Sequence, residues 1–133
     1  MLFVFGTLKR GFPLHEVALG AAPCLGAYRT VARYPMLIAG PWFAPMMLPE
    51  PGTGHQVTGE LYEVEAARLS LIDAIESVGM AGHLRVAIEV EPLDGGRRRK
   101  AFAYLKERAL ATPAHSAFLA GYRDRRFIPP WLR

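Results

Sequence analysis

The feature that most constrains the fold is a pair of strand-like segments joined by a tight turn. Every second residue from Leu84 to Val90 is a large apolar one, and the residues between them are polar or small. This period of two indicates a half-buried β-strand. Residues 94–96 read Asp-Gly-Gly, a typical hairpin turn, and residues 101–105 are a second apolar segment. The sequence therefore predicts an antiparallel β-hairpin, which has to lie within a larger sheet.

Proline excludes a regular helix from a second apolar stretch, residues 34–47. This stretch contains Pro35, Pro41 and Pro45 as well as Gly40. Proline lacks the backbone N–H and clashes with the preceding helical turn. We therefore predict short extended pieces with turns that pack under other elements.

Periodicity and end signals predict the remaining elements. Strands are expected at residues 2–5, 27–31 and 56–64, and helices at residues 13–19, 66–77 and 114–122. Alanine and leucine dominate residues 66–77, and Gly79 is expected to end that helix. Because strands and helices mix without a βαβ rhythm, we expect an α+β protein with a largely antiparallel or mixed, barrel-like sheet.

Length and composition favour one domain over residues 1–133. Hydrophobic residues make up 51% of the chain, which is too many for a disordered protein. The single cysteine, Cys24, excludes an internal disulfide and is expected to be a small buried residue. The apolar run at residues 1–5 is too short for a signal peptide or a membrane span, so a cytoplasmic location is expected.

Positive charge is concentrated at the C-terminal end. Residues 97–133 hold ten of the 16 Lys and Arg residues and two of the 12 acidic residues, whereas residues 1–96 are net negative. The run at residues 97–100, Arg-Arg-Arg-Lys, directly follows the predicted hairpin turn, so we interpret it as a solvated loop. Binding of nucleic acid through this run is the less favoured alternative.

The first predicted strand runs directly into a loop that is bracketed by glycines. Residues 6–11 read Gly-Thr-Leu-Lys-Arg-Gly. Exposed backbone N–H groups at the end of a strand can receive an anion. Gly6 and Gly11 are expected to permit a close approach to the backbone, because neither carries a side chain. On its own, the loop could equally be a plain turn between a strand and a helix.

Glu76 is the candidate for acid–base chemistry. On a helix over residues 66–77, it lies at the rim of the apolar face, whereas Asp73 is expected to point toward solvent. A carboxylate that is partly withdrawn from water is a better general base. The alternative is structural: Glu76 covers the edge of the core and forms a salt bridge, for example with Arg85.

Four segments in order resemble the γ-glutamylcyclotransferase-like family, also called the AIG2-like family. Residues 5–11, Phe-Gly-Thr-Leu-Lys-Arg-Gly, resemble its YGTLxxG signature. Residues 59–64, Gly-Glu-Leu-Tyr-Glu-Val, are similar to its G-E-L-Y-x-V strand, and residues 71–76 to its L-D-x-x-E helix end. Residues 34–40 resemble a segment of the γ-glutamylaminecyclotransferase branch. The match covers most of residues 1–105.

The resemblance implies a fold, a reaction and a site. The fold is a small mixed β-barrel with short helices packed around it. The α-amine of a γ-glutamyl substrate attacks its own γ-carbonyl, which gives 5-oxoproline and a free amine without any metal or organic cofactor. The same likeness makes Glu76 the general base and then the general acid. It also makes Phe5, Gly6, Thr7 and Leu8 the substrate-binding loop.

These considerations also set the expected partners. We expect a small-molecule γ-glutamyl substrate, no nucleic acid and no membrane, in a monomer or a homodimer. The alternative is a non-catalytic module on the same fold that binds a γ-glutamyl compound or a carboxylate. Two departures from the family keep it open: Phe5 stands in place of a tyrosine, and residues 82–85 lack the usual aromatic residue. His83, in that stretch, either replaces the tyrosine's hydrogen bond or lies in a surface loop, and we favour the loop.

Several other side chains are weaker candidates for a site. His15 follows the loop, but a lone histidine is more often a packing or surface residue. The pairs at residues 42–43, Trp-Phe, and 46–47, Met-Met, form either an apolar wall over a substrate or a cover over one end of the barrel. The arginines at residues 123–126 are expected to face solvent.

Overall fold

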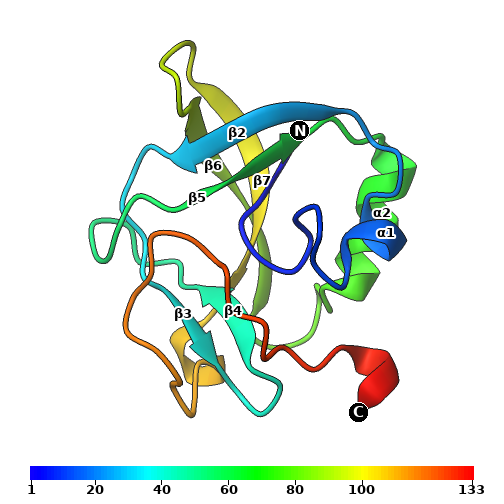
Figure 1. Ribbon diagram of the computed structural model, residues 1–133, viewed down its shortest axis with the longest axis vertical. Coiled ribbons are helices and arrows are strands. Elements are labelled where there is room, and N and C mark those ends of the chain that lie inside the picture. The colour runs from blue at the N-terminus through cyan, green and yellow to red at the C-terminus, as the bar shows by residue number, and fades with distance from the viewer.

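Five strands close into a small barrel that forms the centre of the molecule (Figure 1). The computed structural model describes residues 1–133. The barrel strands are β1 (Leu2–Val4), β2 (Cys24–Thr30), β5 (Thr58–Tyr62), β6 (His83–Pro92) and β7 (Arg99–Lys106). They are arranged in the order β1-β5-β2-β6-β7. Neighbours are antiparallel except β1 and β7, which run parallel where Leu2 pairs with Phe102. The predicted α+β fold with a mixed barrel is therefore confirmed.

The proline-containing stretch forms a second, two-stranded sheet. Its strands are β3 (Met36–Ala39) and β4 (Ala44–Met47), which pair antiparallel at the lower end of the barrel in Figure 1. Met36, Ile38 and Met47 are fully buried and join the core of the barrel. The short extended pieces predicted from the prolines are thus present, and they cover one end of the barrel.

Two helices lie side by side against the barrel wall, α1 (His15–Ala18) and α2 (Ala66–Ile75) (Figure 1). Successive residues of β1 serve two different cores, because successive side chains on a strand point to opposite faces. Phe3 packs inside the barrel, whereas Leu2 and Val4 pack toward the helices. The end of β1 therefore lies between the barrel interior and the helix layer.

The leucine and isoleucine residues of helix α2 pack on the core as its apolar face, except Leu71, which is about half exposed. Those that pack are Leu69, Ile72 and Ile75. Asp73, expected to face solvent, instead binds Arg85 and Tyr104 on the barrel wall, each at 2.7 Å. Arg85 forms an ion pair with this carboxylate and Tyr104 donates a hydrogen bond to it. These two partners hold Asp73 against the barrel wall.

The helix predicted at residues 114–122 is wrong. The segment runs extended beside β3, where the N–H groups of His115 and Leu119 donate to the carbonyl oxygens of Ile38 and Met36. Its backbone groups therefore bond to a neighbouring strand instead of to one another. The only other helical turns are two short 3₁₀ segments, η1 (Arg108–Leu110) and η2 (Pro130–Leu132).

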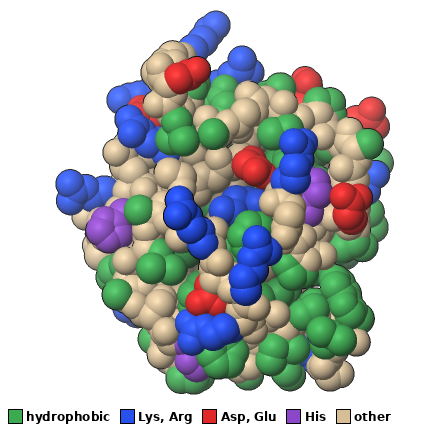
Figure 2. All heavy atoms as spheres, in the orientation of Figure 1, with side chains coloured by type: hydrophobic (Ala, Val, Ile, Leu, Met, Phe, Trp, Pro, Cys, Tyr) green, Lys and Arg blue, Asp and Glu red, His purple; other side chains and the backbone are tan.

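The outer surface confirms one interpretation and overturns another. Residues 97–100 are all exposed to solvent, as expected, but only residues 97–98 lie in the loop, because Arg99 and Lys100 begin β7. Figure 2 shows basic side chains dispersed among apolar and acidic ones on the face drawn. Cys24 is exposed at the start of β2, so its predicted burial is wrong. Neither helix has the length or the apolar run that is needed to cross a bilayer.

Candidate functional site

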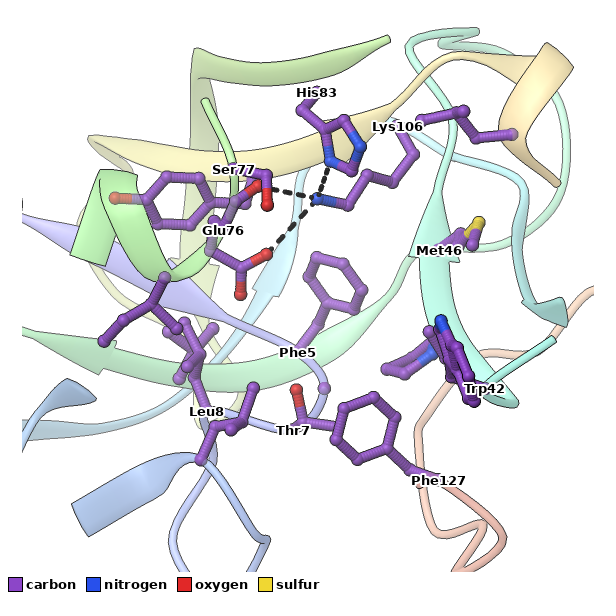
Figure 3. A pocket seen from close by; sticks show the side chains of 18 of the residues that line it. Phe5, Thr7, Leu8, Trp42, Met46, Glu76, Ser77, His83, Lys106 and Phe127 are labelled. Carbon is purple, nitrogen blue, oxygen red and sulfur yellow. Dashed lines mark hydrogen bonds and ion pairs between the residues drawn. The ribbon is translucent and has the colours of Figure 1, made fainter. Parts of the chain in front are cut away.

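A cavity of about 390 Å³ opens beside the end of β1, between the barrel, the helix layer and the β3–β4 sheet. It is lined by the loop after β1, the end of α2, the starts of β4 and β6, the end of β7 and part of residues 127–133 (Figure 3). The five residues predicted from the sequence all lie in its lining: Phe5, Gly6, Thr7, Leu8 and Glu76. The fold thus brings the two distant segments of the predicted site to one cavity.

The loop after β1 presents a row of backbone N–H groups without partners. The N–H groups of Gly6, Thr7 and Leu8 donate to no acceptor in the protein. The carbonyl oxygens of the same three residues are all bonded: they accept from Lys9 N at 3.0 Å, from Leu14 N at 3.1 Å, and from His15 Nδ1 at 2.9 Å, respectively. Tied carbonyls and free N–H groups make the loop locally electropositive, which suits an anion.

His15 is therefore a packing residue, as favoured from the sequence, and it has a specific task. Its ring is buried and packs near Tyr62, with the two ring centroids 5.8 Å apart. From this position, Nδ1 holds the carbonyl of Leu8 on the side of the helix layer.

The two glycines of the loop have different reasons to be glycine. A Cβ built on Gly6 would lie 2.6 Å from Cγ of Pro45, because β4 packs closely on the loop. Gly11 has open space around it, but its φ of +84° is the left-handed region that favours glycine. Packing on Pro45 therefore explains glycine at residue 6, and backbone conformation explains it at residue 11. Close approach of a bound molecule to the backbone stays a prediction for Gly6, which lines the cavity, whereas Gly11 lies outside the lining.

The side chains of Phe5 and Thr7 also line the cavity. Phe5 is buried, and Figure 3 shows its ring in the middle of the cavity wall below Glu76 and Lys106. The Thr7 hydroxyl points into the same space (Figure 3). It is therefore an additional polar group available to a bound molecule.

Glu76 is held at the end of α2 by a helix-terminating motif. The N–H of Ser77 bonds to Ala74 O at 3.2 Å, and the N–H of Val78 bonds to Asp73 O at 2.9 Å. This pair of bonds is the Schellman arrangement, in which the residue after the C-cap is left-handed. That residue is Ser77, with φ +60°, and not the predicted Gly79. Because the helix ends here, the Glu76 side chain projects toward the cavity (Figure 3).

The partner of Glu76 is Lys106, from the end of β7. Lys106 Nζ lies 3.3 Å from Glu76 Oε2 and 3.1 Å from the Glu76 carbonyl oxygen. It also lies 2.9 Å from His83 Nδ1. The salt bridge that the structural alternative expected of Glu76 is therefore present, but its partner is Lys106 and not Arg85, which binds Asp73. The favoured placement of His83 in a surface loop is wrong, since His83 begins β6 and lines the cavity.

Burial changes the acid–base properties of two groups in the cavity wall. Burial, and then the charge of Lys106, lower the pKa of His83, while the nearby backbone carbonyl of Glu76 acts in the opposite direction. Burial and the hydrogen bond to Asp73 raise the pKa of Tyr104 well above its usual value. At neutral pH, the imidazole and the phenol are therefore both uncharged, and Glu76 and Lys106 supply the charge beside the loop.

The far side of the cavity is apolar and comes from two segments. Trp42, Met46 and Phe127 stand across from Glu76 in Figure 3. Their sequence neighbours point elsewhere: Phe43 stacks on His115, and Met47 is fully buried in the core. In each of the pairs at residues 42–43 and 46–47, the first residue therefore lines the cavity and the second helps to cover the barrel.

Sequence reasoning missed Lys106 and the C-terminal contribution. A signal for Lys106 existed, because the period of two along β7 puts it on the same face as Phe102 and Tyr104, which pack toward the helices. No comparable signal marks Phe127 or Arg133, which reach the cavity because residues 123–133 pass over β4. The N–H of Ile128, for example, donates to Trp42 O at 2.9 Å.

Comparison with known proteins agrees with this geometry. The family model described as "Gamma-glutamyl cyclotransferase, AIG2-like" matches residues 2–122. The chain belongs to this family. The matched residues include both the loop after β1 and Glu76, and they extend beyond residues 1–105, which carry the sequence resemblance.

Individual members of the family are similar over most of the chain. Gamma-glutamylaminecyclotransferase of Mus musculus is 42% identical over 97 residues, which cover 70% of this chain and 64% of that protein. The Homo sapiens protein of the same name is 40% identical over 98 residues, 71% of this chain and 63% of that protein. The alignments thus span slightly less than two thirds of these relatives' lengths.

A solved structure extends the likeness to the whole fold. The crystal structure of an AIG2-like protein from Mus musculus superposes with a TM-score of 0.86 at 32% sequence identity. The superposition covers 99% of this chain and 97% of that one. It therefore includes the C-terminal segment that passes over β4 and contributes to the cavity.

Proposed function

We propose that residues 1–133 act as one γ-glutamylcyclotransferase domain that converts a γ-glutamyl amine into 5-oxoproline and a free amine. The observation that carries the proposal is the composition of the cavity. One wall has three adjacent backbone N–H groups without partners, at residues 6–8, and Glu76 faces the same space. The similarity to gamma-glutamylaminecyclotransferases supports the choice of a γ-glutamyl amine as substrate.

The N–H row supports binding of the glutamyl end of the substrate. A γ-glutamyl compound carries an α-carboxylate, and its γ-carbonyl oxygen gains negative charge when the carbon is attacked. Backbone N–H groups that the fold holds in place stabilise such charge without reorganising. Thr7 adds its side-chain hydroxyl to this row. Holding both ends of the glutamyl group keeps it curled, which is most of the task in an intramolecular ring closure.

Glu76 supports the proton transfers. The α-ammonium of the substrate has to lose a proton before its nitrogen can attack the γ-carbon. Glu76 Oε2 is bound to Lys106, whereas Oε1 accepts no hydrogen bond from the protein. We assign this free oxygen as the proton acceptor. The new bond joins the α-nitrogen to the γ-carbon, and the bond from that carbon to the leaving nitrogen breaks. The α-nitrogen loses two protons, one before the attack and one as the ring closes, and Glu76 passes each in turn to the leaving nitrogen, so that the amine departs as an ammonium ion.

The apolar wall supports an organic leaving amine. Trp42, Met46 and Phe127 lie on the side opposite Glu76, where the leaving group of a curled glutamyl amide would extend. An alkyl chain on the amine would lose contact with water there, at a gain of roughly 0.8 kcal/mol per buried methylene. The cytoplasmic location and the choice between monomer and homodimer stay predictions of this proposal.

The test is release of 5-oxoproline from purified protein. Wild type is incubated with γ-glutamyl-ε-lysine and with γ-glutamyl amides of simple alkyl amines, and 5-oxoproline is quantified by mass spectrometry. Glu76→Gln keeps the size of the side chain but removes the base, so we expect a 10²- to 10⁴-fold lower kcat. The matched control is Glu63→Gln, because Glu63 is exposed and lies outside the cavity.

Each outcome has a distinct meaning. Activity that persists in Glu76→Gln would contradict the assignment of the base. Binding of a γ-glutamyl compound by calorimetry, without turnover of any substrate in the panel, would replace the enzyme with a non-catalytic binding module. Loss of activity in Glu63→Gln as well would mean that the substitution acts through folding and not through the site.

A further inference from the structure

The ammonium group of Lys106 is saturated by acceptors from two elements. Its three neighbours are Glu76 Oε2 at 3.3 Å, the Glu76 carbonyl oxygen at 3.1 Å and His83 Nδ1 at 2.9 Å. A lysine ammonium has three N–H donors and no acceptor. Three acceptors for three protons leave no unpaired proton, and the Lys106 side chain is only 14% exposed.

This arrangement fixes the protonation of His83. Since the ammonium only donates, Nδ1 of His83 has to be unprotonated in order to accept. The ring is therefore neutral and carries its proton on Nε2. The lowered pKa of His83 agrees with that state, because burial and the Lys106 charge both disfavour a second cation.

The Lys106 ammonium also compensates for the unfavourable position of the Glu76 carboxylate. Glu76 is the C-cap of α2, where the helix dipole and the last carbonyl groups are negative. Its side chain is only 16% exposed, so water screens the charge poorly. Lys106 contacts both the carboxylate and the adjacent carbonyl, and thus compensates both negative groups at once.

We propose that Lys106 and His83 are positioning residues, which hold the Glu76 carboxylate with Oε1 directed into the cavity. This inference rests on the proposed function for its consequence in catalysis. Lys106 binds Oε2 and leaves Oε1 as the free oxygen. His83 provides the third acceptor, so that the ammonium has a partner for each of its protons while it stays beside Glu76. Neither residue is required to contact the substrate.

The pair has a consequence for pH dependence. Protonation of His83 removes the third acceptor and places a cation beside Lys106, so the ammonium is pushed away from His83 and the support of Glu76 weakens. The charged groups that act on His83 and Lys106 are each other and Glu76. Of the other titratable groups nearby, Tyr104 stays neutral on β7, and Asp73 is paired with Arg85. Arg133, on the opposite wall, stays charged at every relevant pH.

The first experiment reads the imidazole directly and needs no substrate. Long-range ¹H–¹⁵N spectra of the ¹⁵N-labelled wild-type protein distinguish the two neutral tautomers of each histidine, with His83→Asn used to assign the His83 signals. We expect the Nε2–H tautomer at pH 7, and in Lys106→Met a His83 pKa closer to its ordinary value. A proton on Nδ1, or an unchanged titration in Lys106→Met, would overturn the proposal.

The second experiment separates positioning from a general structural role. In Lys106→Met we expect kcat to fall about 10- to 100-fold, part of the 10²- to 10⁴-fold that a positioned general base contributes, with a smaller change in KM. Lys106→Arg should restore part of kcat. Lys100→Met, on an exposed position of the same strand, is the matched control.

Variants of His83 test its half of the pair. His83→Asn retains an acceptor oxygen near the position of Nδ1 but does not titrate, so it should keep a higher kcat than His83→Phe at pH 7 and retain that activity to lower pH. His83→Phe removes the acceptor and should behave like Lys106→Met. Identical kcat, KM and pH profiles for wild type and Lys106→Met would refute the positioning role. Absence of turnover in wild type would instead refute the proposed function, and the NMR result would still decide the pair.

Discussion

Gly6→Ala is the substitution whose effect can be worked out most directly from the structure. The backbone of Gly6 is not left-handed, so alanine can adopt it without strain. The cost comes from contact alone: the new Cβ would lie 2.6 Å from Pro45 Cγ, well inside the 3.4 Å at which ordinary contact begins. Pro45 pairs with Ile38 in the β3–β4 sheet, so the ring cannot move without shifting that sheet.

The expected loss of stability follows from this overlap. Forcing one extra carbon into a packed contact typically costs about 1–3 kcal/mol. Urea denaturation followed by tryptophan fluorescence measures the change in the free energy of unfolding. Because Gly6 and Pro45 both line the cavity, a relative shift also widens the space beside the N–H row, and we expect KM for the γ-glutamyl substrate to rise.

Two further variants make the reasoning refutable. Gly11→Ala costs roughly 1–2 kcal/mol through its left-handed backbone, but it meets no neighbour and should leave KM unchanged. The double variant Gly6→Ala with Pro45→Ala removes the colliding atom, so the two effects should be strongly non-additive. A coupling energy below about 0.5 kcal/mol in this cycle would show that the two residues do not compete for space.

Two other substitutions test the cores. Tyr122 buries a hydroxyl that has no hydrogen-bond partner, so Tyr122→Phe should be neutral or stabilise the protein by up to about 1 kcal/mol at pH 7 in urea denaturation. Burial raises the pKa of Tyr122 to about 12, above its value of about 10 in unfolded chains, so its protonated form contributes stability that is lost as pH rises from about 10 through 12. The free energy of unfolding of Tyr122→Phe should therefore fall less between about pH 10 and 12 than that of wild type. An equally steep fall in both proteins would contradict this expectation. Tyr104→Phe deletes the 2.7 Å hydrogen bond to Asp73 and should cost about 1–2 kcal/mol by the same method, whereas an unchanged midpoint would mean that Arg85 alone satisfies Asp73.

The sheet and one half of the site were predictable because their signals are local. The alternation from Leu84 to Val90 and the turn at 94–96 identified the β6–β7 hairpin, since a strand's faces are read directly from a period of two. The loop at residues 6–8 follows from a strand that ends at a glycine. These features depend on residues that are close together in the chain.

The predictions that are wrong concern residues whose hydrogen-bond or ion-pair partners lie far away in the sequence. Residues 114–122 have helical composition, yet their N–H groups bond to β3, more than 70 residues away. The helical period points Asp73 toward solvent because it takes no account of Arg85 and Tyr104 on the wall. No local signal puts His83 at the site, because its partner, Lys106, lies at the end of another strand.

By itself, the sequence determined the types of the main elements, the barrel-like sheet and the two segments that carry the site, because hydrophobic period, proline, glycine and a family resemblance are properties of the chain. Only the tertiary structure decided what surrounds those segments. It tied back the carbonyl groups of residues 6–8, left their N–H groups free, and placed Lys106 and His83 around Glu76. The physical reason is that a hydrogen bond or an ion pair depends on distance in space, and residues 6, 76, 83 and 106 meet only when the barrel closes.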